Sequence, residues 1–341
     1  MLRPRRLLTC SPNNAMMDKA IIPSVYKGGQ PYEKGGKEAH PMRYYSLNTY
    51  LQQAYGKKLY KIALNGGMTC PNRDGTLGER GCIFCSQGGS GDFASDASLS
   101  ITEQIEHGKS LIRKKYSGSS YIAYFQAYTN TYGPLPKLHR IFTEAVRHPD
   151  IQVLSVATRP DCLSPESIGL LEGLNRSKPV WVELGLQTIH ASTARFIRRG
   201  YDLPVFEKAV SDLHRAGIAV IVHTILGLPG EDLSMTLATM HYLNHMEIDG
   251  IKLQLLHILE GTDLADEYRR NPFPVLSMEE YLALLGKCIA HLREDIVIHR
   301  LTGDGPKNLL IAPMWSADKK KVLNRMHAYF KEQDIRQGKE L

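Results

Sequence analysis

The sequence of 341 residues has no apolar run near the 18 or so residues that a membrane-spanning helix needs, which excludes an integral membrane protein. The amino-terminal stretch MLRPRRLLTC is positively charged, but its apolar segment is too short for the core of a signal peptide. We therefore expect a cytoplasmic protein with no membrane partner.

Cysteine is also scarce. Six cysteines are too few for a disulfide scaffold in a chain of this length. Three of them, Cys70, Cys82 and Cys85, fall within sixteen residues. In a reducing compartment such a cluster is typical of metal binding.

The body of the chain has little excess charge. The net charge is +7, but residues 1–41 hold seven Lys and Arg against three Asp and Glu and so contribute +4. The other 300 residues keep a surplus of +3, which permits a nucleic-acid partner without requiring one. Residues 1–41 show no sustained apolar period. We expect them to be disordered or not part of the functional protein, with Met42 as an alternative start.

Short, nearly continuous apolar runs alternate with helical patterns through the rest of the chain. Such runs are typical of strands buried on both faces of a parallel sheet. Six strand–helix units predict a barrel or an open doubly wound sheet, and periodicity alone does not choose between them. The predicted strands are residues 59–64, 121–126, 151–157, 180–186, 218–226 and 249–256.

The cysteine cluster lies in a loop, residues 65–93, that holds eight of the 29 glycines. Cys70, Cys82 and Cys85 have the spacing C-x11-C-x2-C, which allows all three to reach one centre. A structural zinc site is closed by four ligands, whereas three cysteines on a four-iron cluster leave one iron open. Zinc remains an alternative, with His107 or a distant residue as its fourth ligand, and so do three unliganded thiols.

Several motifs follow one another in an order that resembles the radical S-adenosylmethionine (SAM) superfamily. The long first cysteine spacing resembles its Elp3-like branch, and the fuller strings resemble the YtqA/YhcC-type subgroup, over residues 43–320. The motifs are NGGMTCPNRDGT (65–76), YFQAYTNTY (124–132), ATRPD (157–161), VELGLQ (182–187), RRGYD (198–202), ILGLPGE (225–231) and LTGDGPKNLLIAPMW (301–315).

The resemblance implies an α/β fold, a partial (β/α)6 barrel over residues 42–300, followed by an extension, 301–341, with a basic helix. It implies that Cys70, Cys82 and Cys85 ligate a [4Fe-4S] cluster whose open iron is chelated by SAM. An electron, from a donor such as flavodoxin or ferredoxin, then cleaves SAM to a 5′-deoxyadenosyl radical that takes a hydrogen from the substrate.

Two polar residues of the fourth predicted strand are candidate SAM contacts. Period two places Glu183 and Gln187 on the face of Gly185, toward the interior of a barrel. A buried carboxylate needs a partner, which is SAM or, alternatively, a structural salt bridge with Arg159. Arg159, at the end of the third strand, is a further candidate contact for the cofactors.

Other candidates come from the resemblance or from their positions in the chain. The resemblance implies that Gly227 and Pro229 form a turn against the adenine. Phe84, inside the C-x2-C segment, is placed either to shield a cluster from water or to anchor the loop. A GGE-type motif that holds the SAM amino group in many members is absent after the second strand. Gln126 or Asn130 would supply polar contacts there, although neither is a carboxylate. The candidate catalytic residues, expected at the barrel mouth, are Lys252, His257 and Arg300.

The carboxyl-terminal stretch predicts a helix with Val322, Met326 and Phe330 on its apolar side. Lys319–Lys321 and Arg325 form either a solvated face or a phosphate-binding patch for RNA. Analogy with the Elp3-like branch suggests modification of the wobble uridine of tRNA. A zinc hydrolase and a zinc-dependent RNA-binding protein remain alternatives for the same three cysteines.

Overall fold

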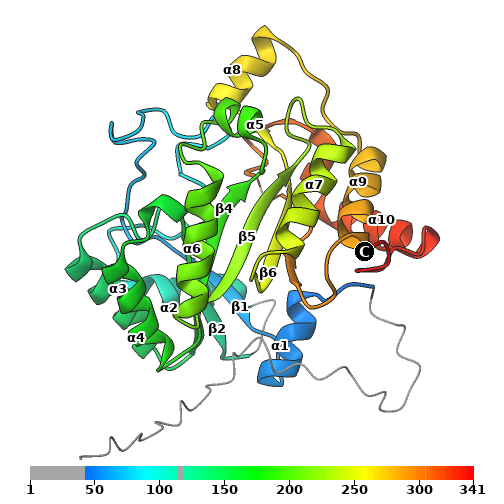
Figure 1. The fold of residues 1–341 in the computed structure, drawn as a ribbon. Coiled ribbons are helices and arrows are strands. Elements are labelled where there is room, and N and C mark those ends of the chain that lie inside the picture. Colours follow the sequence, from blue (N-terminus) through cyan, green and yellow to red (C-terminus); the bar gives the residue numbers. More distant parts are fainter. Residues whose placement is uncertain (1–42, 114–117, 304) are drawn as a thin grey trace, which may run out of the picture.

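The computed structural model describes residues 43–113, 118–303 and 305–341, so the expectation for residues 1–41 lies outside the described residues. A parallel sheet of seven strands in the order β1–β2–β3–β4–β5–β6–β8 curls into a partial barrel (Figure 1). The strands are β1 (Tyr60–Leu64), β2 (Tyr121–Phe125), β3 (Ile151–Thr158), β4 (Val180–Gln187), β5 (Ala219–Leu226), β6 (Gly250–Leu255) and β8 (Val297–Arg300).

All six predicted strands are present and in sequential order, which confirms the α/β partial barrel. The sheet has one further edge strand, β8, that the apolar pattern did not reveal, because its four residues end in a histidine and an arginine. A short antiparallel pair, β7 (Ile258–Leu259) and β9 (Leu310–Ala312), lies beyond the carboxyl end of β6.

Helices cover the outer face of the sheet, because the crossovers between parallel strands must pass over it. Buried residues of α2, α3, α6, α7 and α9 form one large apolar core with the outward side chains of the strands. The helices are α1 (Leu47–Tyr55), α2 (Ile101–Ile112), α3 (Leu135–Arg147), α4 (Pro165–Asn175), α5 (Ala191–Phe196), α6 (Leu203–Arg215), α7 (Leu233–Asn244), α8 (Asp263–Arg270), α9 (Met278–Ala290) and α10 (Lys319–Glu332). Within the described ranges, no helix combines the length and apolarity needed to cross a bilayer.

The inside of the barrel is layered from bottom to top. Its lowest layer is apolar, and Tyr50 and Leu51 of α1 pack there against Trp181 and Ile221. Helix α1 thus closes the amino-terminal end of the barrel (Figure 1). Glu183 and Lys252 lie above this layer, nearer the carboxyl ends of their strands, on the side where βα-loops meet and ligands bind in barrel folds.

The carboxyl-terminal segment forms the predicted helix. Val322, Met326 and Phe330 of α10 are buried, and Met326 and Phe330 belong to the large core. Beyond α10, the Gln337 side chain accepts a hydrogen bond from the Tyr45 backbone N–H at 2.8 Å. These contacts attach the segment firmly to the barrel.

Candidate functional site

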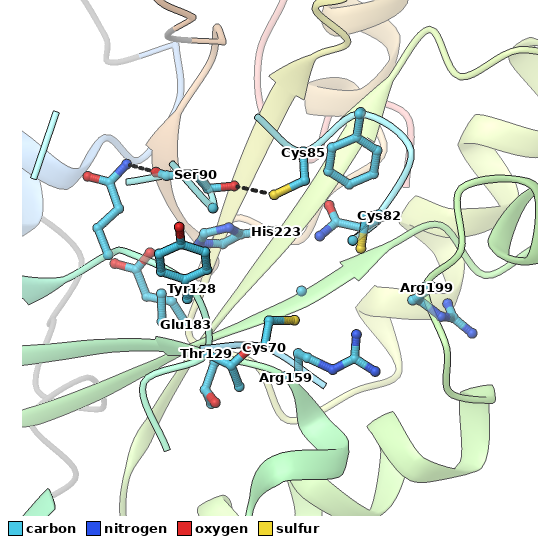
Figure 2. A pocket seen from close by; sticks show the side chains of 18 of the residues that line it. Cys70, Cys82, Cys85, Ser90, Tyr128, Thr129, Arg159, Glu183, Arg199 and His223 are labelled. Carbon is cyan, nitrogen blue, oxygen red and sulfur yellow. Dashed lines mark hydrogen bonds and ion pairs between the residues drawn. The ribbon is translucent and has the colours of Figure 1, made fainter. Parts of the chain in front are cut away.

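The three clustered cysteines lie in the long loop between β1 and α2, above the carboxyl ends of the strands. Cys70, Cys82 and Cys85 all border one cavity in the barrel mouth (Figure 2). Phe84 of the same loop borders it too. The backbone N–H of Cys85 donates to the carbonyl of Cys82 at 2.9 Å, so the C-x2-C segment is a tight turn. The structure therefore brings together residues that lie up to fifteen positions apart.

Polar contacts hold this loop in place. The Asn72 amide donates to the Arg198 carbonyl at 2.7 Å and lies 3.4 Å from the Cys82 sulfur. The Arg73 guanidinium donates to the carbonyls of Cys85 and Ser86, at 3.0 and 2.6 Å. These hydrogen bonds join the loop to neighbouring protein atoms, and they fix the path of the loop that carries the three cysteines.

Two glycines let the loop lie directly on the segment after β2. A Cβ at Gly89, which has φ of 58°, would lie 2.3 Å from the Tyr128 ring. A Cβ at Gly91 would lie 2.4 Å from the Ala127 Cβ. No larger residue fits at these points without moving the loop, and the glycine-rich composition is explained by this close packing.

The spacing of the three sulfurs bears on which metal centre fits. A tetrahedral zinc with Zn–S bonds near 2.3 Å would hold its sulfurs about 3.8 Å apart. Among the described residues, Cys70, Cys82 and Cys85 are not a group whose ligand atoms all lie within 4.8 Å of one another. His107, the alternative fourth zinc ligand, lies on α2 and does not border the cavity. A cluster that presents a different iron to each sulfur fits the wider spacing better than a single ion.

The floor of the cavity is built around one buried carboxylate. Glu183 is 1% exposed and accepts hydrogen bonds from Lys61 at 2.6 Å, Ser155 at 2.7 Å and His223 at 2.7 Å. It also pairs with Lys252, whose ammonium lies 3.2 Å from the Tyr124 hydroxyl. Four strands therefore contribute donors to a single carboxylate of β4.

These neighbours fix the charge states on the floor. Burial alone would raise the pKa of Glu183, but Lys252, Lys61 and His223 outweigh it and hold that pKa well below the ordinary value. Burial and the adjacent Lys252 lower the pKa of His223 to about 4. Burial also lowers the pKa of Lys252, and Lys61 and Arg300 add to this effect. His223 is thus neutral near pH 7 and donates from Nε2 to an ionised Glu183.

The alternative salt bridge between Glu183 and Arg159 is absent. Glu183 lies opposite Ala157 in the β3–β4 register, and Arg159 is two residues further along the chain. The Arg159 guanidinium instead pairs with Asp161 at 2.7 Å, while still bordering the cavity. Glu183 is therefore in a salt bridge, with lysines that lie on β1 and β6.

Gln187 ends β4 in a backbone conformation that glutamine adopts seldom, with φ of 67°. The β4–β5 ladder is irregular at this point. The Gln187 Oε1 atom is buried and, among the described residues, has no hydrogen-bond partner. Because Gln187 borders the cavity, this acceptor is available to a polar ligand with a hydroxyl or ammonium group.

Most of the sequence-predicted site residues meet at the cavity, and a few lie elsewhere. Asn130 is buried, and its amide donates to the carbonyls of Phe125 and Ala157, which is a structural arrangement. His257 borders a neighbouring hollow beside Gly303. Gly227 and Pro229 form the turn after β5 and do not border the cavity. Those that border it are Cys70, Cys82, Cys85, Phe84, Gln126, Arg159, Glu183, Gln187, Lys252 and Arg300.

Sequence reasoning missed four members of the floor. Lys61, Tyr124, Ser155 and His223 were not singled out as site residues, although each lies within a predicted strand. The available signal was a charged or titratable residue in an otherwise apolar run, such as Lys61 in LYKIAL and His223 in IAVIVHTIL. Such a residue needs a buried partner on a neighbouring strand.

The comparisons with known proteins agree with this geometry. Residues 74–243 match the model of the radical SAM superfamily, and residues 248–332 match the radical SAM C-terminal domain. The chain is 40% identical to protein YtqA of Bacillus subtilis over 297 residues, covering 87% of this chain and 92% of YtqA. It is 35% identical to protein YhcC of Escherichia coli K12 over 288 residues, covering 84% and 91% of the two chains.

The chain belongs to the radical SAM superfamily and, within it, to the Elp3-like branch that includes YtqA and YhcC. Membership of this superfamily makes it an enzyme, and the superfamily implies a [4Fe-4S] cluster and SAM as cofactors.

Two further matches concern the Elp3-like branch. The structure of Elp3 from Methanocaldococcus infernus superposes with a TM-score of 0.62 at 16% identity, covering 82% of this chain and 64% of that one, and so supports the fold. A tRNA uridine(34) acetyltransferase of Methanocaldococcus jannaschii is 25% identical over 161 residues, which is 46% of this chain and 29% of that protein.

Proposed function

We propose that Cys70, Cys82 and Cys85 hold a [4Fe-4S] cluster and that the cavity beneath them holds SAM and a substrate. The observation that carries this proposal is the convergence of three thiols on a cavity with polar walls, where the described part of the chain supplies no fourth thiol. A cluster held in this way supplies reductive cleavage of SAM, from which hydrogen abstraction from the substrate follows. The electron comes from a reduced donor such as flavodoxin or ferredoxin.

The protein's own residues bind and orient the cofactors. Gln187 offers an unpartnered buried acceptor to the hydroxyl or ammonium groups of SAM. Glu183 already accepts hydrogen bonds from four side chains. It therefore acts on SAM indirectly, because it fixes Lys252 and His223 on the floor of the cavity. Phe84 borders the cavity and packs against an apolar cluster of the mouth, where it limits the access of water to the cysteines. Lys252 and Arg300 are the candidate catalytic residues that face the cavity.

The first test is metal analysis of anaerobically purified protein with an absorption spectrum. We expect about four irons per chain and broad absorption near 400 nm, as is typical of cysteine-ligated clusters. Replacing Cys70, Cys82 or Cys85 with Ala removes the iron. Cys162→Ala and Cys288→Ala are matched controls that retain it, since these thiols lie outside the cavity. Stoichiometric zinc without iron would overturn the proposal.

The second test measures the release of 5′-deoxyadenosine in the presence of dithionite. Gln187→Leu should slow the release while the iron content stays unchanged, because it removes a polar contact and keeps the volume. Normal release by this variant would show that Gln187 does not contact SAM.

We propose tRNA as the substrate, with modification of the wobble uridine side chain. Support comes from the partial similarity to a tRNA uridine(34) acetyltransferase and from the Elp3 fold. Lys319–Lys321 begin α10 with exposed side chains and are the candidate phosphate contacts. Arg325 is less available, because it pairs with Glu279 and Glu332 at 2.9 and 3.1 Å.

Binding of tRNA at several salt concentrations tests this part. Replacing Lys319, Lys320 and Lys321 with Gln should weaken binding and reduce the slope of log affinity against log salt by about 0.7 to 0.9 per lost contact. The measurement is made with and without residues 1–41, which carry a competing charge of +4. Absence of tRNA binding by the intact protein would indicate a smaller substrate.

A further inference from the structure

His223 joins the buried carboxylate of the floor to the cavity. It is the fifth residue of β5 and borders the cavity, with Gly185 of β4 and Lys252 of β6 as its partners in the two strand registers (Figure 2). Its Nε2 atom lies 2.7 Å from the Glu183 carboxylate. The His223 side chain is 16% exposed and the Glu183 side chain 0%, so the histidine is the part of this pair that a ligand can reach.

The contact with Glu183 fixes which ring nitrogen of His223 carries the proton. Lys252 and Lys61 hold Glu183 ionised, and an ionised carboxylate only accepts hydrogen bonds. The Nε2 atom of His223 therefore donates. Because burial and the adjacent Lys252 lower the pKa of the ring to about 4, the ring has no second proton near pH 7. Its Nδ1 atom then keeps a lone pair and is a hydrogen-bond acceptor.

The Nδ1 atom of His223 is open to a ligand. Among the described residues it has no hydrogen-bond partner, and it is not one of the fully buried polar atoms that lack a partner. It is therefore reached from the cavity that the side chain borders. An acceptor in a partly buried site is left without a hydrogen bond only at a cost, so this position favours a ligand that brings an N–H or O–H group.

A second neutral polar group lies beside this acceptor. Gln254 of β6 is two residues after Lys252, the register partner of His223, and it also borders the cavity. Its side-chain amide has both a donor and an acceptor. An acceptor beside a donor is the complement of an imide edge, such as that of uracil, in which one N–H group lies between two carbonyl oxygens. Proteins recognise unpaired bases by hydrogen bonds to edges of this kind.

We propose that His223 binds the substrate by accepting, at Nδ1, a hydrogen bond from an N–H or O–H group. This inference rests on the proposed function and deepens it, because in a uridine substrate the donor is the N3–H group of uracil. Gln254 then donates to a neighbouring carbonyl oxygen of the base, and Glu183 fixes the ring of His223 and its tautomer. The other source of such a donor is SAM, whose ammonium and ribose hydroxyl groups have the same chemistry.

The test compares two stem-loop RNAs that differ only at an unpaired wobble position, which is uridine in one and 3-methyluridine in the other. The methyl group removes the N3–H donor. Affinities for iron-loaded protein are measured by fluorescence anisotropy, with SAM present and without a reductant. The intact protein should bind the uridine RNA about fivefold to a hundredfold more tightly, because the methylated base leaves the Nδ1 acceptor of His223 unpaired. Equal affinity for the two RNAs would overturn the proposal.

Two variants of His223 separate this hydrogen bond from the contact with Glu183. The amide of His223→Asn lies near the place of Nδ1 and keeps an acceptor there. The amide of His223→Gln lies near the place of Nε2 and keeps only the donor to Glu183. The preference for uridine over 3-methyluridine should therefore persist in His223→Asn and be lost in His223→Gln. The reverse order, or the same preference in both variants, would overturn the assignment to Nδ1.

The matched control is a second histidine–glutamate pair, which lies outside the cavity. The His214 Nε2 atom lies 3.2 Å from the Glu247 carboxylate, and the two side chains are 39% and 63% exposed. His214→Gln should keep the full preference for uridine. If a variant of His223 fails to fold, the comparison of the two RNAs on the intact protein still decides the question.

Affinity for SAM identifies the source of the donor. It is measured by calorimetry on the same iron-loaded preparations, without RNA. Unchanged affinity for SAM in His223→Gln assigns the acceptor to the substrate, whereas a loss that matches the loss of RNA binding assigns it to SAM and overturns the substrate assignment. If the intact protein binds neither RNA, tRNA is not the substrate and the uracil donor is refuted with it. Iron content and 5′-deoxyadenosine release report separately on the cofactors of the proposed function.

Discussion

The network around Glu183 predicts an unequal effect of removing its two main partners. Lys252 is 3% exposed, and in Glu183→Ala its ammonium keeps only the hydroxyl and ring of Tyr124 among its described contacts. A buried charge that loses its partner typically costs about 3–5 kcal/mol of unfolding free energy. In Lys252→Met, Glu183 still has Lys61, His223 and Ser155, so the cost is closer to that of one charged hydrogen bond, about 1.5–3 kcal/mol.

The double variant sharpens the prediction. Adding Lys252→Met to Glu183→Ala should recover part of the lost stability, because the variant no longer buries an unpaired ammonium. Urea unfolding of anaerobic protein measures these changes, followed by tryptophan fluorescence. Trp181 is a local reporter, since it is buried and its ring lies 6.0 Å from the Lys61 ammonium. Costs that simply add in the double variant would refute the coupling, and equal costs in the two single variants would refute the asymmetry.

Three further predictions follow from the same contacts. Between pH 6.5 and about 4, residue 223 is protonated in the unfolded chain, whereas folded His223 stays neutral. The free energy of unfolding should therefore fall by about 3 kcal/mol on acidification over this range. His223→Gln should flatten a series of urea midpoints measured over the same pH range. Glu183, whose pKa is also lowered, loses its contribution in the same direction below its ordinary pKa of 4.5, so a midpoint that rises on acidification would contradict both. Gly89→Ala should reduce iron retention in anaerobic protein because its Cβ would meet the Tyr128 ring, whereas Gly75→Ala, at φ of 89° with open space around it, should retain iron at a strain of about 1–2 kcal/mol. Replacing Phe84 with Ala should speed loss of the 400 nm absorption in air, and an unchanged decay rate would remove its shielding role.

Most of the strands of the fold could be predicted from the sequence. Five of the six predicted strands are short apolar runs buried on both faces, whereas β1, at the edge of the sheet, is fully buried on one face only. The turns beside the strands contain glycine or proline. The strand β8 could not be predicted, because its four residues end in His299 and Arg300 and do not form a recognisable apolar pattern. The pair β7 and β9 was missed for a similar reason: its strands have two and three residues and lie fifty positions apart.

Part of the site could be predicted from the sequence. The predicted part consists of residues that are close together in the chain, and the missed part of residues that only the fold brings together. The cysteines are close in the chain, so their spacing alone predicts a shared centre. The partners of Glu183 are not: Lys61 is 122 positions before it and Lys252 is 69 positions after it. Period two indicates that each points inward, but the stagger of seven strands decides which inward residues share a layer. That stagger places Lys61 rather than Arg159 beside Glu183, and it brings charged residues from distant parts of the chain together on one floor.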